Sequence, residues 1–203
     1  MDSVHEATAY LIELVKVAPS WISALVLFLC AWVEYVLPPF PGDTVMVAGG
    51  FFAAKGSLSF PLVFFALLFG SVFGESVAFF FGRLSLYYGW THKLIDYFFK
   101  PESQTRLQGW FERHGNWLLL CNRFLPGVRG PVMMMAGIAQ VSFTRVLIWG
   151  TCSAILWNSL LMLLGYWFSH NFDHLLEFFT RYTQIVATLL VVFVLFKLFK
   201  TRL

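Results

Sequence analysis

A proline-rich break inside an apolar region constrains this chain more than any other feature. Residues 36–43 read Val-Leu-Pro-Pro-Phe-Pro-Gly-Asp, and a run of prolines followed by glycine cannot remain helical. The apolar stretches on either side are both shorter than the roughly 20 residues that a membrane-spanning helix needs. Half-helix, break and half-helix together predict a re-entrant hairpin over residues 21–54, with Pro38, Pro41 and Gly42 at its tip. The backbone of such a tip must be buried in protein or line a wet cavity, because lipid offers it no hydrogen bonds.

The composition indicates that the solvent of this chain is a lipid bilayer. Of its 203 residues, 59% are hydrophobic and 12% are charged, whereas an average soluble domain is about 25% charged. The mean hydropathy is +0.72, and a soluble fold of this length cannot hide so much apolar surface. We therefore predict an all-α integral membrane protein that forms one membrane domain over residues 1–203. The small net charge of +3 gives no indication of a nucleic-acid partner.

A second break of the same kind lies in the other half of the chain. Residues 123–131 read Arg-Phe-Leu-Pro-Gly-Val-Arg-Gly-Pro and stand between two short apolar runs. Pro126 and Gly127 interrupt the helix here, as the prolines do in the first break. We predict a second re-entrant hairpin over residues 116–139.

The remaining segments define the expected topology. In chain order we expect an amphipathic N-terminal helix (1–20), a membrane span (61–82), a cytoplasmic interfacial segment (83–115) and two further spans (146–168 and 183–199). Basic residues outside the two tips concentrate in the interfacial segment and at the C-terminus, so the positive-inside rule predicts a cytoplasmic C-terminus. The two hairpins of this multi-pass protein then enter the membrane from opposite sides.

The two halves also resemble each other in sequence. In each half the break is followed by Ala-Gly, then by Ser-Phe, and then by a long span that contains glycines. These dipeptides are Ala48-Gly49 and Ser59-Phe60 in the first half, and Ala136-Gly137 and Ser142-Phe143 in the second. Together with the opposed hairpins, this similarity predicts an inverted repeat. Transporters of that design bind their substrates at broken helices where the repeats meet.

Each break is flanked by charges of one sign, with Glu34 and Asp43 beside the first and Arg123 and Arg129 beside the second. A charge inside a membrane segment costs on the order of 3 kcal/mol, so we expect these residues to be functional. Two carboxylates in a poorly hydrated cavity disfavour each other's ionisation, and such a pair can accept and release a proton. Guanidinium groups stay charged and present forked donors that suit a phosphate, so the two arginines are predicted to bind the phosphate of a substrate.

The same residues also allow a structural interpretation, in which the two acids and two arginines form buried ion pairs that lock the hairpins together. A further acid, Glu75, lies within the 61–82 span, where it either reaches the same cavity or pairs with a tip arginine. His170 and His174 have a spacing that can hold zinc. Without a third ligand or an HExxH pattern, we predict neither a metal site nor a cofactor.

Two signatures in this chain resemble those of the DedA family, also called VTT-domain or SNARE-associated membrane proteins. They are Glu34-x3-Pro38-x2-Pro41-Gly42-Asp43 and Arg123-Phe124-x-Pro126-x2-Arg129, in this order and at this separation. The resemblance covers residues 21–168. It implies a bacterial inner-membrane protein with opposed re-entrant hairpins, in which the two acids and the two arginines are the essential residues. It also implies lipid translocation that depends on the proton-motive force, with undecaprenyl phosphate linked to bacterial members and phospholipids to eukaryotic relatives.

We therefore expect a flippase that moves undecaprenyl phosphate across the inner membrane, coupled to protons, and not an enzyme. Its expected partners are the lipid substrate and the bilayer, and the sequence leaves open whether the chain forms a homo-oligomer. Three alternatives remain: a phospholipid scramblase, a proton-coupled antiporter of ions or small solutes, and a membrane lipid phosphatase. The phosphatase would need a nucleophile or general base beside the arginines, and no histidine lies near either tip in the sequence.

Overall fold

The computed structural model describes residues 19–37, 40–85, 101–124 and 129–169, and residues 101–108 by their backbone alone. All regular secondary structure in these ranges is helical, as the sequence predicts. Several expected features lie outside the described residues: most of the N-terminal helix (1–20), part of the 83–115 segment, the 183–199 span, Pro38, Pro126, Gly127, His170 and His174.

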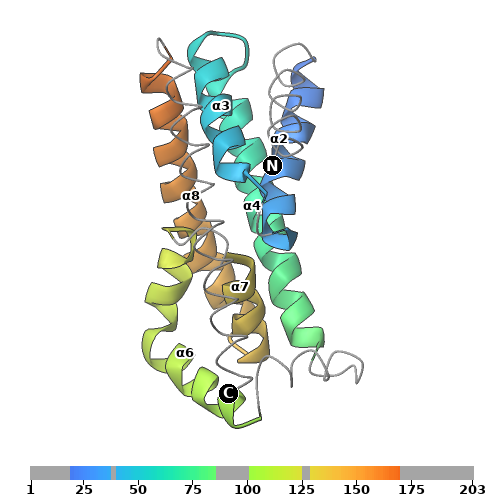
Figure 1. Cartoon of the computed structure of the whole chain (residues 1–203), viewed down its shortest axis with the longest axis vertical. Helices are drawn as coiled ribbons and strands as arrows, with labels where there is room; N and C mark the ends of the chain where they lie inside the picture. Colours follow the sequence, from blue (N-terminus) through green and yellow to red (C-terminus); the bar gives the residue numbers. More distant parts are fainter. Residues whose placement is uncertain (1–18, 38–39, 86–100, 125–128, 170–203) are drawn as a thin grey trace, which may run out of the picture.

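The first broken segment consists of α2 (Ser20–Val36) and α3 (Gly42–Ala54), which run in opposite directions (Figure 1). α2 ends where Leu37 takes an extended conformation (φ −114°, ψ 95°), as steric contact with a following proline requires. The helical backbone resumes directly after Pro41. The predicted pattern of half-helix, break and half-helix is therefore present, and its re-entrant placement in a membrane stays a prediction.

The second broken segment has the same plan. α6 (Pro101–Cys121) leads into the short 3-10 helix η1 (Asn122–Phe124), and α7 (Arg129–Ile138) follows the break. α6 is continuous across residues 115 and 116, where the sequence analysis placed a boundary between the interfacial segment and the second hairpin. One helix thus extends over both expected segments.

Two long helices form the frame on which the broken segments pack. α4 (Phe60–Leu84) and α8 (Phe143–Trp167) are long and apolar enough to cross a membrane, with mean hydropathies of 2.0 and 1.7 in their most apolar windows. They correspond to the spans predicted at 61–82 and 146–168. In Figure 1 both follow the long axis of the molecule, and they run in opposite directions.

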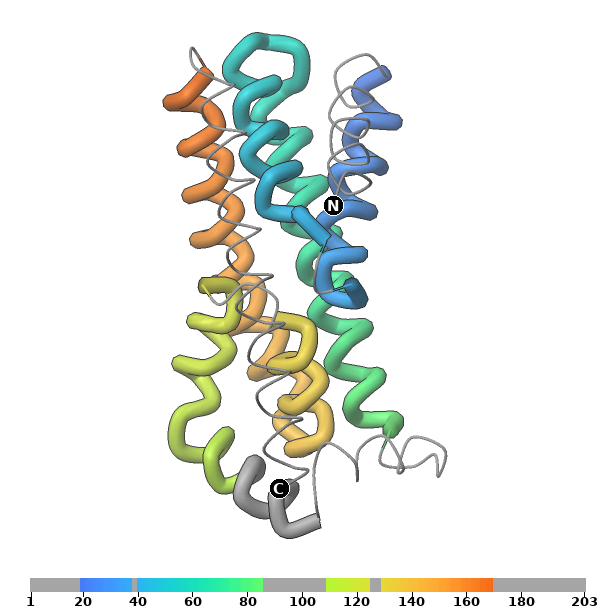
Figure 2. Tube along the Cα trace, viewed as in Figure 1, coloured from blue at the N-terminus to red at the C-terminus, as the bar shows by residue number. Residues whose placement is uncertain are grey.

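The halves of the chain pack reciprocally. α2 packs on α4 and α6 on α8, whereas the helix after each break crosses to the other half, α3 onto α8 and α7 onto α4 (Figure 2). Gly82 of α4 lies against the carbonyl of Met134, and Gly165 of α8 against the carbonyl of Val47, so a Cβ at either glycine would strike backbone. Gly82 and Gly165 occupy the same position when each is counted from the start of its helix. The likeness of the two halves thus extends from their sequences to their packing, and the inverted repeat stays a prediction.

Two hydrophobic cores form, one around each of the helices that follow a break. The core around α3 includes Leu27, Val47, Phe52 and Met162. The core around α7 includes Phe79, Leu119, Met133 and Val146. The end of α2 and the starts of α3 and α7 lie near the middle of the long axis of the molecule (Figure 2).

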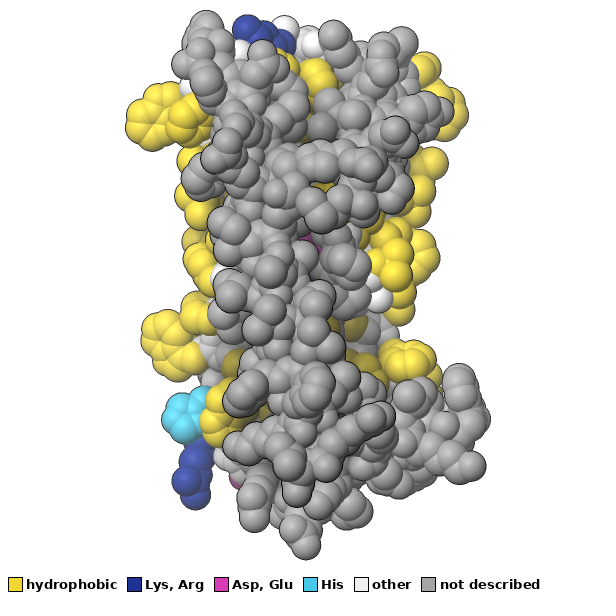
Figure 3. Space-filling model, in the orientation of Figure 1, with side chains coloured by type: hydrophobic (Ala, Val, Ile, Leu, Met, Phe, Trp, Pro, Cys, Tyr) yellow, Lys and Arg dark blue, Asp and Glu magenta, His cyan; other side chains and the backbone are white. Residues whose placement is uncertain are grey.

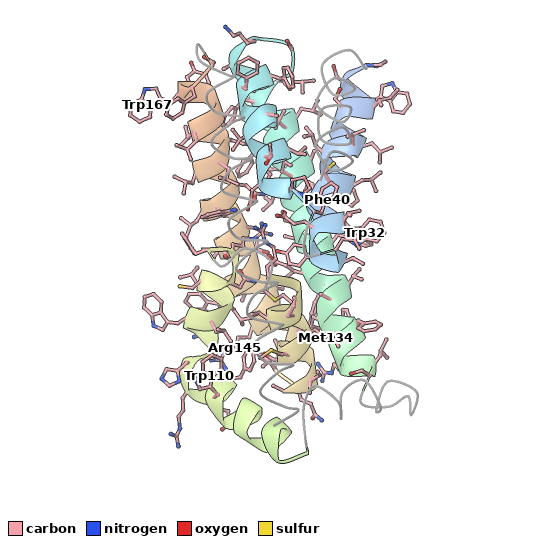
Figure 4. All side chains as sticks on the ribbon, in the orientation of Figure 1. Trp32, Phe40, Trp110, Met134, Arg145 and Trp167 are labelled. Atoms are coloured by element: carbon pink, nitrogen blue, oxygen red, sulfur yellow. The ribbon has the colours of Figure 1, made fainter. Side chains whose placement is uncertain are left out.

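The outside of the molecule is apolar along its length. Large hydrophobic side chains remain exposed on the long helices, among them Phe65, Phe69, Leu156 and Leu163. In Figure 3 such side chains cover both flanks, while the visible Lys and Arg side chains lie toward the two ends. Trp167 and Trp110 project outward at different levels along the long axis (Figure 4). An apolar flank with tryptophans toward its edges suits a bilayer, in which tryptophan prefers the interfaces.

Candidate functional site

The two breaks meet through Arg129, the first residue of α7. Its Nη1 lies 2.8 Å from Oε2 of Glu34, near the end of α2. Its Nη2 donates a hydrogen bond of 2.9 Å to Oδ2 of Asp43, in the first turn of α3. All three side chains are buried: the exposed fractions are 1% for Arg129, 6% for Glu34 and 9% for Asp43. The structure thus joins both predicted acids, which flank the first break, to one of the two predicted arginines, which flank the second.

The donors of Arg129 are only partly used. Nη1 is close enough to Glu34 for an ion pair, yet neither it nor Oε2 of Glu34 is aligned for a hydrogen bond. Nε of Arg129 also has no hydrogen-bond acceptor among the described residues. Buried polar atoms are nearly always hydrogen-bonded in folded proteins, so unpaired donors at this position indicate capacity for another acceptor.

The second predicted arginine, Arg123 in η1, has a different set of partners. Its Nη2 and Nε lie 2.9 and 3.3 Å from Oε1 of Glu75, and its Nη1 donates to Oδ1 of Asn158 at 3.3 Å. Nη2 also donates to the hydroxyl of Tyr35, which in turn donates to Glu75 at 2.7 Å. Glu75 thus pairs with a tip arginine, as one of the two interpretations expects, and its role as an acid of the substrate cavity stays a prediction.

An aromatic pair lies beside Asp43. The indole Nε1 of Trp157 donates a hydrogen bond of 2.9 Å to Oδ1 of Asp43. The ring of Trp157 meets that of Phe124 edge to face, with 5.1 Å between the ring centroids. Asp43 is therefore held from two sides, by Arg129 and by Trp157.

Two glycines make room for the buried acids. A Cβ on Gly42 would collide with the carboxylate of Glu34, and a Cβ on Gly150 would collide with that of Glu75. Gly42 was expected only to break the helix, but in the structure it also leaves room for the carboxylate of Glu34. Gly150 was not singled out from sequence.

Sequence reasoning missed three members of this cluster: Tyr35, Trp157 and Asn158. Each is a single polar or amphipathic residue in an apolar helix, which is a weak signal when taken alone. Asn158 could have been found from the repeat, because it occupies the same position in α8 as Glu75 does in α4, counted from the first residue of each helix. Both of these side chains contact Arg123.

The cluster as a whole is rich in charged side chains. Two guanidinium groups face three carboxylates, which leaves one negative charge in excess if every acid is ionised. Within the described ranges there is no group of three or more His, Cys, Asp or Glu side chains placed to hold a metal ion. The chemistry that this arrangement offers is anion recognition by guanidinium and proton exchange by carboxylates.

Comparison with known proteins identifies the family. The VTT domain family model matches residues 40–167, which include Asp43, Glu75, Arg123 and Arg129. This chain belongs to the VTT-domain, or DedA, family. The matched residues include α3, α4, α6, α7 and α8. Glu34 precedes the first matched residue in the sequence.

Several named relatives align with most of this DedA-family chain. The alkaline phosphatase-like protein of Lactococcus lactis subsp. lactis is 28% identical over 171 residues, 80% of this chain and 79% of its own length. Undecaprenyl phosphate transporter A of Staphylococcus aureus is 26% identical over 178 residues, 84% and 86% of the two chains. Protein DedA of Escherichia coli K12 is 27% identical over 176 residues, 83% and 78%. No solved structure matches the chain.

Proposed function

We propose that this DedA-family protein carries a lipid phosphate across the bacterial inner membrane and binds the phosphate in the buried arginine–acid cluster. The observation that supports this most is the state of Arg129, which is 1% exposed and faces two carboxylates, and whose Nε and Nη1 have no hydrogen-bond acceptor among the described residues. A phosphate group supplies acceptors of the right charge and geometry for these donors. The name of the Staphylococcus aureus relative, undecaprenyl phosphate transporter A, favours a polyprenyl phosphate as the lipid.

Binding of a phosphate at Arg129 couples to protons for an electrostatic reason. Glu34 and Asp43 each lie against one of the two Nη atoms of this guanidinium, so an anion that binds through an Nη atom as well as through Nε would displace at least one of them. A displaced carboxylate would remain buried without a counter-charge, which costs several kcal/mol by order of magnitude. Protonation of the displaced acid removes that charge. Each cycle of phosphate binding and release would therefore take up and return a proton.

The proposed route uses the two breaks. We infer that both broken segments are re-entrant and enter the membrane from opposite sides, so that the site at their meeting point opens alternately to either face. The polar tips would line a wet passage for the phosphate. The prenyl chain would stay in the bilayer, against the apolar flanks.

Proteoliposome translocation tests the proposal. Undecaprenyl phosphate should cross the membrane faster with purified wild-type protein than in protein-free liposomes, and an imposed pH gradient should change the rate. Arg129→Ala should abolish the movement, because it removes the guanidinium that would bind the phosphate. Arg83→Ala serves as the matched control, since it deletes a cation of α4 whose nearest ring contact, with Phe79, lies outside the cluster. Full activity of Arg129→Ala would refute the proposal.

The same liposomes separate the other candidate activities. Movement of a labelled phospholipid at the same rate would indicate a scramblase, and proton–cation exchange without lipid phosphate would indicate an antiporter. The name of the Lactococcus lactis relative, alkaline phosphatase-like protein, is the reason to measure inorganic phosphate as well. Release of phosphate from the lipid would favour an enzyme over a carrier.

A further inference from the structure

We propose that the two buried arginines have different tasks: Arg129 binds the anion, whereas Arg123 is a structural anchor held by Tyr35, Glu75 and Asn158. This inference rests on the proposed function, because it assigns the phosphate of that substrate to one of the two arginines. It also predicts that the three partners of Arg123 matter for the fold of the site and not for contact with the ligand.

Four of the five N–H donors of Arg123 are engaged in hydrogen bonds. Each of its three nitrogens donates within the protein: Nε to Glu75, Nη1 to Asn158, and Nη2 to both Glu75 and Tyr35. Its guanidinium carbon also lies 5.5 Å from the centre of the Tyr35 ring, at the distance of a cation–π contact. The side chain is 0% exposed. A ligand phosphate could reach this guanidinium only by breaking several buried hydrogen bonds to charged groups, each worth roughly twice a neutral one.

Arg129 uses fewer of its donors than Arg123 does. Only Nη2 makes a hydrogen bond, to Asp43, while Nη1 and Nε have none in the described part of the chain. Arg129 can therefore offer a phosphate hydrogen bonds that it does not make to the described residues.

The partners also differ in the elements that supply them. Arg123 bonds to residues of α2, α4 and α8, so it ties the start of the second break to three helices from both halves of the molecule. Both acids beside Arg129 belong to the first broken segment. Movement of that segment alone would loosen the Arg129 contacts and leave most of the Arg123 contacts in place. This is the behaviour expected of a binding group next to a fixed anchor.

Binding and stability measurements on the full-length protein in detergent separate the two tasks. The probe is farnesyl phosphate, with uncharged farnesol as its control, and calorimetry gives the half-saturating concentration. Arg129→Lys should raise that concentration about tenfold, the effect of losing one or two charged hydrogen bonds, and should keep Tm within about 2 °C of the wild-type value. Arg123→Lys and Tyr35→Phe should lower Tm by about 5 °C or more, because buried bonds are lost, and leave the half-saturating concentration within about twofold.

Two further variants keep the test decisive. Arg83→Lys is the matched control, a change of the same type outside the cluster, and should alter neither quantity. If Arg123→Lys does not fold, Gly150→Ala perturbs the anchor more gently, because its Cβ displaces the carboxylate of Glu75. It should lower Tm without changing farnesyl phosphate binding.

The possible failures are distinguishable. A folded Arg123→Lys or Gly150→Ala protein that binds farnesyl phosphate about ten times more weakly would overturn the division of tasks and leave the proposed function intact. Equal binding of farnesyl phosphate and farnesol by the wild-type protein would instead overturn the proposed function, and with it the task of Arg129. In that case the Tm values alone would decide whether Arg123 is an anchor.

Discussion

Neutralising Glu75 should destabilise the protein far more than neutralising Glu34. Among the described residues, Glu75 is the one carboxylate within ion-pair distance of Arg123, at 2.9 Å. Arg129 has two such carboxylates, Glu34 and Asp43. Glu75→Gln therefore leaves a fully buried guanidinium without a counter-charge, whereas Glu34→Gln leaves Arg129 with an acid still in place.

The contacts of the two acids lead to different expected losses in the free energy of unfolding. Removing one partner of a buried ion pair costs about 3–5 kcal/mol, and the lower value applies to Glu75→Gln because the amide oxygen can still accept from Arg123 and Tyr35. For a chain of this length, 1 kcal/mol corresponds to roughly 2–4 °C in Tm, so we expect a fall of about 6–12 °C. Glu34→Gln brings the Arg129 group from an excess negative charge to neutrality. Its cost should be well below that of Glu75→Gln, because Arg129 keeps Asp43 as a counter-charge.

Thermal unfolding of the purified full-length protein in detergent, followed by far-ultraviolet circular dichroism, measures both effects on one scale. Glu112→Gln is the matched control, because Glu112 is exposed on α6 and its neutralisation should leave Tm unchanged. Equal losses for Glu75→Gln and Glu34→Gln, or a larger loss for Glu34→Gln, would refute the reasoning. Such a result would mean that the electrostatic environments of the two arginines do not differ as their contacts imply.

Two further predictions concern packing and the aromatic pair. Gly82→Ala should lower the free energy of unfolding by about 1–3 kcal/mol, because its Cβ would meet the backbone of Met134. Gly109→Ala should raise the free energy of unfolding by up to about 1 kcal/mol, because that helical glycine has open space around it. Thermal unfolding compares the two variants. Trp157→Phe keeps an aromatic ring but removes the donor to Asp43, so lipid phosphate translocation should slow while the protein still folds. An unchanged translocation rate would exclude a role for this hydrogen bond.

Much of the fold follows from local sequence properties. The spans at α4 and α8 are visible as long apolar runs, and the breaks are visible because prolines cannot continue a helix. The 115/116 boundary was less predictable. The composition changes there from polar to apolar, yet α6 continues through it, because a helix can pass from one environment to another without any change in its backbone hydrogen bonds.

The residues of the candidate site were also visible from sequence where they carry charge. Glu34, Asp43, Arg123 and Arg129 stand out because ionisable groups are costly inside a membrane segment. Tyr35 and Trp157 do not stand out in the same way, since aromatic residues are common throughout such helices. Their importance comes from the hydrogen bonds they make to charged groups across the molecule.

The two broken points were determined by the sequence alone, since proline removes a donor and clashes with the preceding turn wherever it stands. The sequence likewise determined that acids flank one break and arginines the other. Only the tertiary structure decided the partners: both acids of the first break meet Arg129, while Arg123 pairs with Glu75 from a long helix. Such pairing depends on how α3 and α7 cross onto the opposite long helices. Crossings of that kind are set by side-chain packing between segments far apart in the chain, and no local pattern encodes them.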